Sequence, residues 1–339
     1  SRAASLAGPA PRARARRDCT LVHTAPVRAG TARACQEEAG IASDVTTPPA
    51  GLDRRVLFGV LLMCTASTIF PVMNGLVQVL SRSYPSEQLI WARTTAHLLI
   101  VLALLLPRYG LALVIPRRPG AQILRSCLLL GSTALFFFGV KDIPLAKAAC
   151  ISLMAPFFVT LLAWPMLGER IRAMRLAAVL LGFLGVIVVI RPGAAVFQPA
   201  SLLIVGSALC YAVYQIYTRS VAGQDRPETS VVYSALVGSV VMSLVVPFVW
   251  IMPHSAADMA LMAALGAMGA AGHYCVARAM TYAQANVLSP FQYWQIIGSV
   301  LVGYAVSGLF PEPHVWLGAA IIVGAGLTIA LTAARSRIG

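Results

Sequence analysis

The sequence is short of charged residues, and acidic residues are the scarcer kind. Of its 339 residues only 11% are charged, with 12 aspartates and glutamates against 26 lysines and arginines, while 58% are hydrophobic. A soluble domain averages about 25% charged and about 45–50% apolar residues. A soluble fold of this composition would leave too much apolar surface in water, so the composition predicts a protein embedded in a lipid bilayer.

Several chemical signatures are also missing. A phosphate-binding loop needs a lysine after a glycine, and the two lysines, Lys141 and Lys147, each follow an apolar residue instead. The seven cysteines form no Cys-x-x-Cys pair, and five lie in apolar runs, where packing is the expected role. The basic residues lie between hydrophobic runs, as in membrane proteins, and not on a soluble face. We therefore expect no cofactor, no metal and no nucleic-acid partner.

Residues 1–53 differ from the rest of the chain. Arginine, alanine and proline dominate them, and they contain no apolar stretch that could form a signal-peptide core. This composition predicts a disordered tail. Three interpretations of the tail stay open: a targeting segment, a contact with anionic lipid, or an extension that results from the choice of start site.

Ten apolar runs, each about long enough to cross a bilayer as a helix, follow this tail. They are 56–80, 87–106, 122–140, 143–166, 173–190, 200–219, 229–251, 258–281, 285–309 and 314–334. With a cytoplasmic N-terminus, fourteen basic residues fall in cytoplasmic segments, Arg125 among them, and four fall outside. This bias favours cytoplasmic termini, which an even number of spans requires. The predicted fold is an all-α integral membrane protein with ten transmembrane helices, in the bacterial inner membrane.

The two halves of the chain are similar to each other. Residues 176–190 read LAAVLLGFLGVIVVI and residues 317–331 read LGAAIIVGAGLTIAL, while APFFV at 155–159 corresponds to SPFQY at 289–293. Each half holds five runs, and a duplicated unit with an odd number of spans inserts its second copy upside down. We predict two inverted repeats, 54–193 (spans one to five) and 198–335 (spans six to ten). The alternative is chance similarity between apolar runs.

Short motifs occur in a fixed order along the chain. They are LIWAR at 89–93, IPLAKAA at 143–149, LGERI at 167–171, IRPG at 190–193, SPFQY at 289–293 and FPEPHVWLGAA at 310–320. Over about residues 56–334 this set resembles the drug/metabolite transporter superfamily, in its ten-span group with paired EamA domains. The resemblance implies transport of a small metabolite. The second unit has Ser307-Gly308-Leu309 where the family often repeats the Gly-acid pair, so a symmetrical role for Glu169 is not implied.

Polar side chains inside the runs are the candidate substrate contacts, because showing them to lipid is costly. Arg93 and His97 lie one turn apart in the second run. Arg93 either snorkels to the headgroups or lines a central cavity and pairs with an anionic substrate group, a role that the family resemblance favours. His273, in the eighth run, either bonds a neighbouring carbonyl or contacts substrate. Lys147, near the start of the fourth run, is expected to snorkel.

Two polar faces and a set of possible hinges complete the expected site. The sixth run carries three candidates on one helical face, Tyr211, Tyr214 and Gln215, and the ninth run carries Gln292, Tyr293, Trp294 and Gln295. These faces either bond to other helices or form the wall of a cavity. The candidate gate or hinge residues are prolines that interrupt runs and one acid at the end of a run: Pro71, Pro156, Pro290 and Glu169. The alternatives are static kinks that neighbouring helices tolerate and, for Glu169, a surface ion cluster.

These features predict a secondary transporter. It would move a small organic metabolite (amino-acid-like, nucleotide-like or drug-like) across the cytoplasmic membrane by alternating access, with export as the expected direction. Its expected partners are the substrate and the lipid bilayer, and the chain is expected to be a monomer or a homodimer. The alternatives are a membrane-embedded enzyme acting on a lipid or acyl substrate, which five scattered histidines argue against, and a receptor without transport.

Overall fold

The computed structural model describes residues 54–167, 173–191, 198–221, 225, 227–283 and 288–335, which belong to one compact unit, Leu52–Gly339. Helices joined by short connections make up these residues, and no strand occurs among them. The predicted all-α fold is therefore confirmed for this part of the chain. The predicted tail, 1–53, and the candidate gate residue Glu169 lie outside the described residues.

The helices follow the predicted runs closely. The first half contains α2 (Arg54–Leu80), α3 (Ser86–Tyr109), the 3-10 helix η1 (Gly110–Leu113), α4 (Pro119–Val140), α5 (Leu145–Ser152), α6 (Ala155–Leu167) and α7 (Ala173–Ile190). The second half contains α8 (Ala200–Val221), α9 (Pro227–Val245), η2 (Val246–Phe248), α10 (Ala256–Tyr282), η3 (Ser289–Tyr293), α12 (Trp294–Ser307) and α13 (Pro313–Arg335). Each run coincides with one helix or with two consecutive helices.

Eight helical segments in the described ranges are long and apolar enough to cross a membrane. One of them, Leu145–Leu162, joins α5 and α6, and a shorter apolar segment, Pro313–Ile329, lies within α13. Large apolar side chains such as Leu104 and Leu180 are exposed on the outer faces of their helices, as contact with lipid allows. The chain is a multi-pass integral membrane protein.

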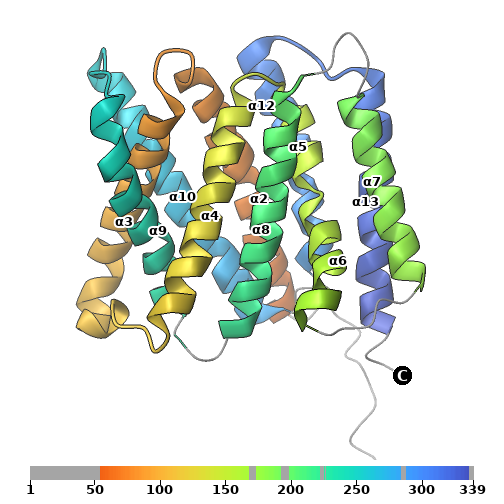
Figure 1. Ribbon diagram of the computed structural model, residues 1–339, viewed down its shortest axis with the longest axis horizontal. Helices are drawn as coiled ribbons and strands as arrows, with labels where there is room; N and C mark the ends of the chain where they lie inside the picture. Colours follow the sequence, from red (N-terminus) through yellow and green to blue (C-terminus); the bar gives the residue numbers. More distant parts are fainter. Residues whose placement is uncertain are drawn as a thin grey trace, which may run out of the picture. The chain divides into compact units, whose positions relative to one another are not determined.

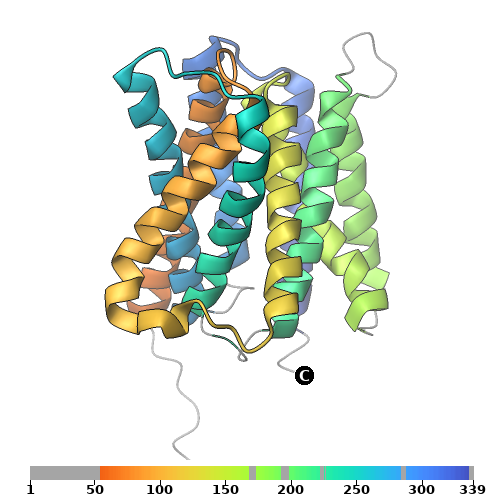
Figure 2. The same cartoon turned by 60° about the vertical axis from the view of Figure 1, so that its left-hand side comes forward.

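The helices run back and forth between two ends of one bundle (Figure 1). The first residues of α2 and the last residues of α13 lie at the same end, in both side views (Figures 1 and 2). We call this the proximal end, and we call the opposite end, where α2 ends and α3 begins, the distal end. The α7–α13 pair forms one side of the bundle, and α3, α9 and α10 pack together on the other side.

Helix contacts are reciprocal between the two halves of the chain. The first helix of the first half, α2, packs against α10, and the first helix of the second half, α8, packs against α4. Likewise α3 packs against α10, and α9 packs against α4. The pairs α3–α9 and α7–α13 each join helices that hold the same place in the two halves. The interface between the halves therefore runs through the middle of the bundle.

The three candidate prolines lie in different settings. Pro156 follows a two-residue turn, 153–154, that separates α5 from α6, and Pro290 lies in η3, directly before α12. Both breaks occur at the same place in their halves. Pro71, in contrast, lies within an unbroken α2, so the helix has no break there, and a hinge at Pro71 stays a prediction. A Cβ on Gly298 of α12 would lie 2.9 Å from Pro71 Cγ, so close packing of a neighbouring helix supports this position.

Candidate functional site

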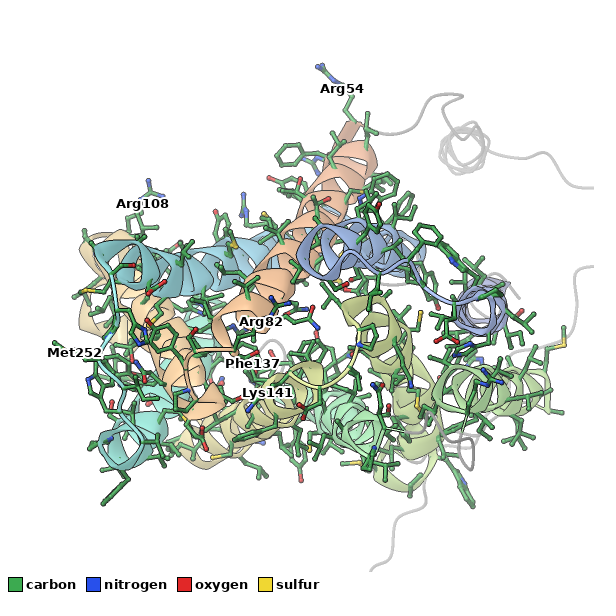
Figure 3. All side chains as sticks on the ribbon, turned by 90° about the horizontal axis from the view of Figure 1, so that it is seen from above. Arg54, Arg82, Arg108, Phe137, Lys141 and Met252 are labelled. Atoms are coloured by element: carbon green, nitrogen blue, oxygen red, sulfur yellow. The ribbon has the colours of Figure 1, made fainter. Side chains whose placement is uncertain are left out.

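A buried arginine links three helices in the distal third of the bundle. Arg93 of α3 lies about 10 Å from the distal end of its helix, at about 1.5 Å per residue, and is only 8% exposed. Its Nη1 donates to Thr133 Oγ1 of α4 at 3.2 Å, and its Nη2 lies 3.3 Å from His273 Nε2 of α10. Its Cζ is 5.8 Å from the centre of the Phe137 ring, which lies in the middle of the helices seen from above (Figure 3). Arg93 therefore points into the bundle and does not snorkel.

Two histidines extend this group of basic side chains. His97, one turn further along α3, stacks on His273, with ring centroids 5.9 Å apart and an interplanar angle of 13°. The ring of Phe70 meets His273 edge-on at 5.4 Å. The expected bond from His273 to a neighbouring carbonyl is not found in the described chain, since its Nε2 faces the guanidinium of Arg93 instead. We call Arg93, His97 and His273 the basic cluster.

Glycines of α10 allow the two helices of the cluster to meet. A Cβ on Gly266 would lie 2.4 Å from Ala96 Cβ and 2.7 Å from the backbone nitrogen of His97. A Cβ on Gly269 would lie 3.4 Å from Arg93 Nε. Small residues let helix backbones approach closely inside a membrane, so these glycines bring His273 within reach of α3.

No carboxylate of the described residues forms an ion pair with the basic cluster. Arg93 Nε and His97 Nε2 are buried and have no hydrogen-bond partner in the part of the chain that the structure describes. A buried charge without compensation costs several kcal/mol as an order of magnitude, unless a counter-charge or a hydrogen-bonding ligand approaches it. The cluster therefore has the chemistry of a binding site for an anionic group.

A second buried arginine lies nearer the proximal end. Arg125 of α4 is 2% exposed, and its Nη2 donates to Ser230 O and Ser234 Oγ of α9, both at 2.7 Å. Its Cζ is 5.1 Å from the centre of the Tyr214 ring of α8. The predicted run 122–140 already contains Arg125, although the charge count treats it as a residue of the cytoplasmic side; in the structure α4 begins at Pro119 and Arg125 is buried in the bundle.

A local signal in the sequence could have located Arg125. Arg125 and Ser126 lie three and four residues after Gln122, so both neighbour Gln122 on one face of α4, and all three are buried. A basic residue that shares a helix face with other polar residues is expected to point into the bundle, whereas one in a connection is expected to lie in water. Arg125 is therefore a further candidate functional residue, beyond those that the sequence indicated.

The candidates of the sixth run face the interior. Tyr211 and Tyr214 stack with ring centroids 5.5 Å apart and an interplanar angle of 27°. Tyr211 packs against the central core, and Tyr214 contacts Arg125. Gln215 is partly buried and makes no hydrogen bond to another described residue. The aromatic pair thus lies beside Arg125, at the boundary between α4 and α8.

The candidates of the ninth run do not join the basic cluster in this structure. The hydroxyl of Tyr293 lies against Gly326 of α13. Trp294 is half-exposed, and its Nε1 donates to a threonine hydroxyl of α2 at 3.1 Å. Gln292 and Gln295 are partly buried and make no hydrogen bond within the described ranges. A shared pocket that includes these residues stays a prediction.

A carboxylate ties α4 to the connection before α9, close to Arg125. Asp225 accepts hydrogen bonds from the backbone nitrogen of Arg117 at 2.7 Å and from Gln122 Nε2 at 2.9 Å. The hydrogen bond from Gln122 is the main cause that lowers the pKa of Asp225 below its ordinary value, and the backbone N–H of Arg117 adds to it. This tie helps to fix the start of α4, and with it the position of Arg125.

Acid is expected to weaken this tie. Because the pKa of Asp225 is lower in the folded protein, its stabilising effect is fully present above the ordinary value of about 4 and is lost as the pH falls through the lowered value. The apparent Tm of the wild type should therefore fall more steeply than that of Asp225→Asn as the pH drops from about 4 to about 2. Thermal unfolding of both proteins across this range measures the difference, and equal slopes would contradict it.

A multi-span helical bundle with a buried basic cluster between its halves, which has no carboxylate partner among the described residues, suits a membrane protein that binds an anionic group. The sequence matches the EamA-like transporter family twice, over residues 57–191 and 198–331. These two matches cover most of the chain, so the chain belongs to the EamA-like transporter family. The resemblance to a transporter family with paired EamA domains is confirmed, while membership of its ten-span group stays a prediction.

Three transporters are similar to most of this chain. A riboflavin transporter of Vibrio cholerae is 29% identical over 270 residues, which are 79% of this chain and 91% of that protein. An S-adenosylmethionine uptake transporter of Rickettsia conorii is 29% identical over 230 residues, 68% of this chain and 78% of the relative. A pseudopaline exporter of Pseudomonas aeruginosa is 27% identical over 283 residues, 81% and 96% of the two chains. A solved structure with 20% identity covers 83% of this chain and 98% of its own at a TM-score of 0.60, which shows a shared fold.

Proposed function

We propose that this protein is a secondary transporter that carries a small organic metabolite with an anionic group by alternating access. The observation that carries the proposal is the basic cluster, which joins α3 of the first half to α10 of the second half and lacks a carboxylate partner among the described residues. A site between two halves opens to either side of the membrane when one half rocks against the other. Arg93 is the proposed anchor of the anionic group.

Two inverted units, 54–193 and 198–335, are the proposed architecture of the carrier. The two family matches support these boundaries, and so does the reciprocal packing of α2 on α10 and of α8 on α4. Ten crossings follow if η3 with α12 and α13 also cross the bilayer. Both ends of the described chain then lie on one side, and the distribution of basic residues favours the cytoplasm of a bacterial cell for that side.

The relatives support the size and type of the substrate. By their names they transport riboflavin, S-adenosylmethionine and pseudopaline, which are metabolite-sized organic molecules. One is named for uptake and one for export, so the direction in this chain, for which export is expected, stays a prediction. For coupling to protons, His97 and His273 are the proposed proton-binding groups, because no described aspartate or glutamate lies in the middle of a span.

Flux measurements in proteoliposomes test the proposal. Purified protein would be offered labelled metabolites that carry carboxylate or phosphate groups, together with neutral analogues. We expect saturable uptake of at least one anionic compound, above the leak of protein-free liposomes. Turnover of a lipid or acyl substrate without any gradient would indicate an enzyme instead, and binding without flux would indicate a receptor.

A further inference from the structure

A cavity of about 330 Å³ lies at the distal end of the bundle, apart from the basic cluster. The first turn of α5, the end of α7, the last turns of α12 and the start of α13 enclose it. Its volume falls at the lower end of the range for small-molecule pockets, roughly 300–1,000 Å³. No residue of the basic cluster lines it, so the cavity and the cluster are two separate places in the fold.

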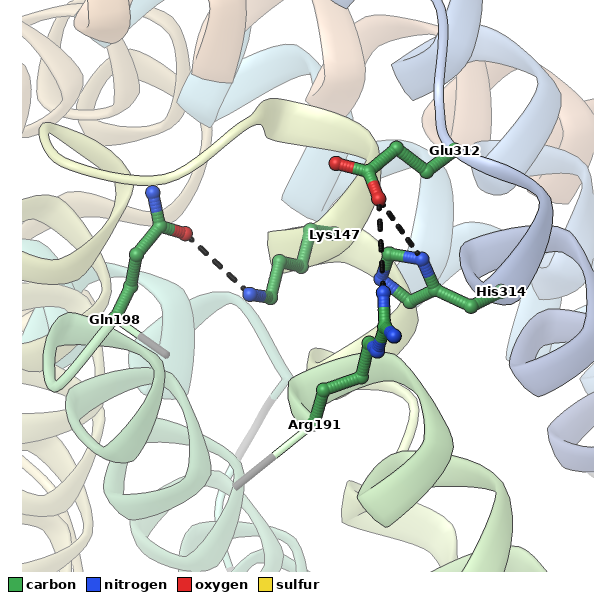
Figure 4. A network of polar contacts seen from close by, with 5 residues as sticks. All are labelled: Lys147, Arg191, Gln198, Glu312 and His314. Carbon is green, nitrogen blue, oxygen red and sulfur yellow. Dashed lines mark hydrogen bonds and ion pairs between the residues drawn. The ribbon is translucent and has the colours of Figure 1, made fainter. Parts of the chain in front are cut away.

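A buried lysine forms part of the wall of this cavity. Lys147 of α5 is only 8% exposed, so the prediction that it snorkels is wrong. Its Nζ donates one long hydrogen bond, of 3.4 Å, to Gln198 Oε1 (Figure 4). An ammonium group has three hydrogens to donate, and a buried charge needs fuller compensation than one weak bond. Lys147 therefore offers unused donor capacity to a ligand.

Three more ionisable side chains lie at the rim of the same cavity. Glu312 Oε2 is 3.9 Å from Arg191 Nη1 and 3.1 Å from His314 Nδ1 (Figure 4). The side chains of Arg191 and Glu312 are 48% and 64% exposed, so their attraction is screened by solvent. One carboxylate thus faces basic residues from α5, α7 and α13, which leaves a positive balance. Residues 192–197, PGAAVF, lie outside the described residues and contain no ionisable side chain.

Arg191 holds a backbone conformation that favours glycine. Its φ is 52°, in the left-handed region, directly after the end of α7. Helices commonly place glycine at this position, because other residues are strained there. Strained backbone conformations are frequent at ligand sites, where the required position of the side chain offsets the energetic cost of the strain. Arg191 gives the cavity a guanidinium that glycine would not supply.

We propose that this cavity is a second binding site, which takes the carboxylate or phosphate group of a small ligand. Lys147 and Arg191 bind the oxyanion from the wall and from the rim. Glu312 is the internal competitor, which releases Arg191 when the ligand enters. Two sources can supply such a group, a soluble metabolite and the headgroup of an anionic lipid. Binding at this site does not depend on transport. A negative binding result would therefore not contradict the proposed function.

NMR of the two lysines tests the proposal directly. With ¹³C placed only at the ε-carbon of lysine, the protein gives one signal for Lys147 and one for the exposed Lys141, which serves as an internal control. The full chain in nanodiscs of zwitterionic lipid would be titrated with succinate and with inorganic phosphate. We expect a saturable shift of the Lys147 signal and a constant Lys141 signal. A shift caused by phosphatidylglycerol in the nanodisc, without soluble anion, would identify the lipid headgroup as the source.

Three variants, read through the same Lys147 signal, test the assigned roles. Arg191→Gln should weaken succinate or phosphate binding by about tenfold, since a charge-assisted hydrogen bond is lost. Glu312→Gln should tighten it severalfold, since the competing carboxylate is removed. Arg82→Gln, an exposed arginine at the distal end that does not line the cavity, should leave it unchanged. A Lys147 signal that no anion shifts, or the same affinity in all three variants, would overturn the proposal.

Discussion

Replacement of Arg93 by glutamine is expected to lower the flux of the anionic substrate by at least about 30-fold at subsaturating concentration. Removal of one partner of a buried charged contact costs about 2–5 kcal/mol, and each 1.4 kcal/mol is about tenfold in affinity. The apparent Tm should hold or rise, because the variant no longer buries a charge that lacks a counter-ion among the described residues. Flux and thermal unfolding measured on one preparation separate this result from a loss of folding.

A second arginine of the same helix provides the matched control for Arg93. Arg108 of α3 is exposed and points away from the bundle (Figure 3), so Arg108→Gln should keep its flux within about twofold of the wild type. Arg93→Lys keeps the charge but loses the planar fork that reaches both Thr133 and His273, so an intermediate flux is expected. Equal flux in Arg93→Gln and in the wild type would remove Arg93 from the substrate site.

A methyl group added at Gly266 is expected to separate α10 from α3. The new Cβ would lie 2.7 Å from the backbone nitrogen of His97, and a backbone atom cannot move aside as a flexible side chain can. Overpacking of this kind costs typically about 1–3 kcal/mol, against a gain in helix propensity of up to about 1 kcal/mol. Gly266→Ala should therefore lower the apparent Tm by several degrees and reduce flux as well, because His273 moves away from Arg93.

The same substitution at an open position is the control for Gly266. A Cβ on Gly131 of α4 would meet no atom within 4 Å, so Gly131→Ala should match or exceed the wild type in apparent Tm, through helix propensity alone. Thermal unfolding of both variants in the same lipid gives the comparison. If Gly266→Ala were as stable as Gly131→Ala, the close approach of α10 to α3 would be wrong.

The helices could be predicted from the sequence because a bilayer permits few alternatives. Inside lipid every backbone donor must be satisfied locally, so a continuous apolar run about 20 residues long has one regular conformation open to it. For this reason the predicted run 173–190 coincides with α7, which ends at Ile190. The start of α4 is less well predicted: the helix begins at Pro119, three residues before the predicted run 122–140, because proline suits the first turn of a helix, where no intrahelical donor is needed.

The depth and partners of the basic side chains could not be predicted in the same way. Arg125 lies near the end of the predicted run 122–140, where a solvated side chain is expected, and it is contacts with α9 and α8 that bury it. The burial of Lys147 depends on α7 and α13, which enclose the cavity beside α5. Arg93 meets His273, 180 residues away, because glycines of α10 allow a close approach. Contacts like these depend on tertiary packing, which local sequence patterns do not report.

Whether a proline breaks its helix also depends on tertiary packing, as Pro71 shows. Proline removes a hydrogen-bond donor and usually kinks or breaks a helix, so a local rule predicts an interruption. In the structure α2 continues, with α12 packed closely on it at Gly298. Pro156, in contrast, follows a break between α5 and α6. The same residue type thus occurs with and without a break, which a local rule does not distinguish.

Access of water to the basic cluster from both sides of the membrane is the most direct test of the alternating-access account. Thr133, whose hydroxyl accepts from Arg93, would be changed to cysteine in a background without the seven native cysteines. A membrane-impermeant anionic thiol reagent would then be added to the inside or the outside of sealed vesicles. The account predicts modification of Thr133→Cys from either side, slowed by the transported substrate. Modification from one side only, or at a rate that substrate does not change, would contradict it.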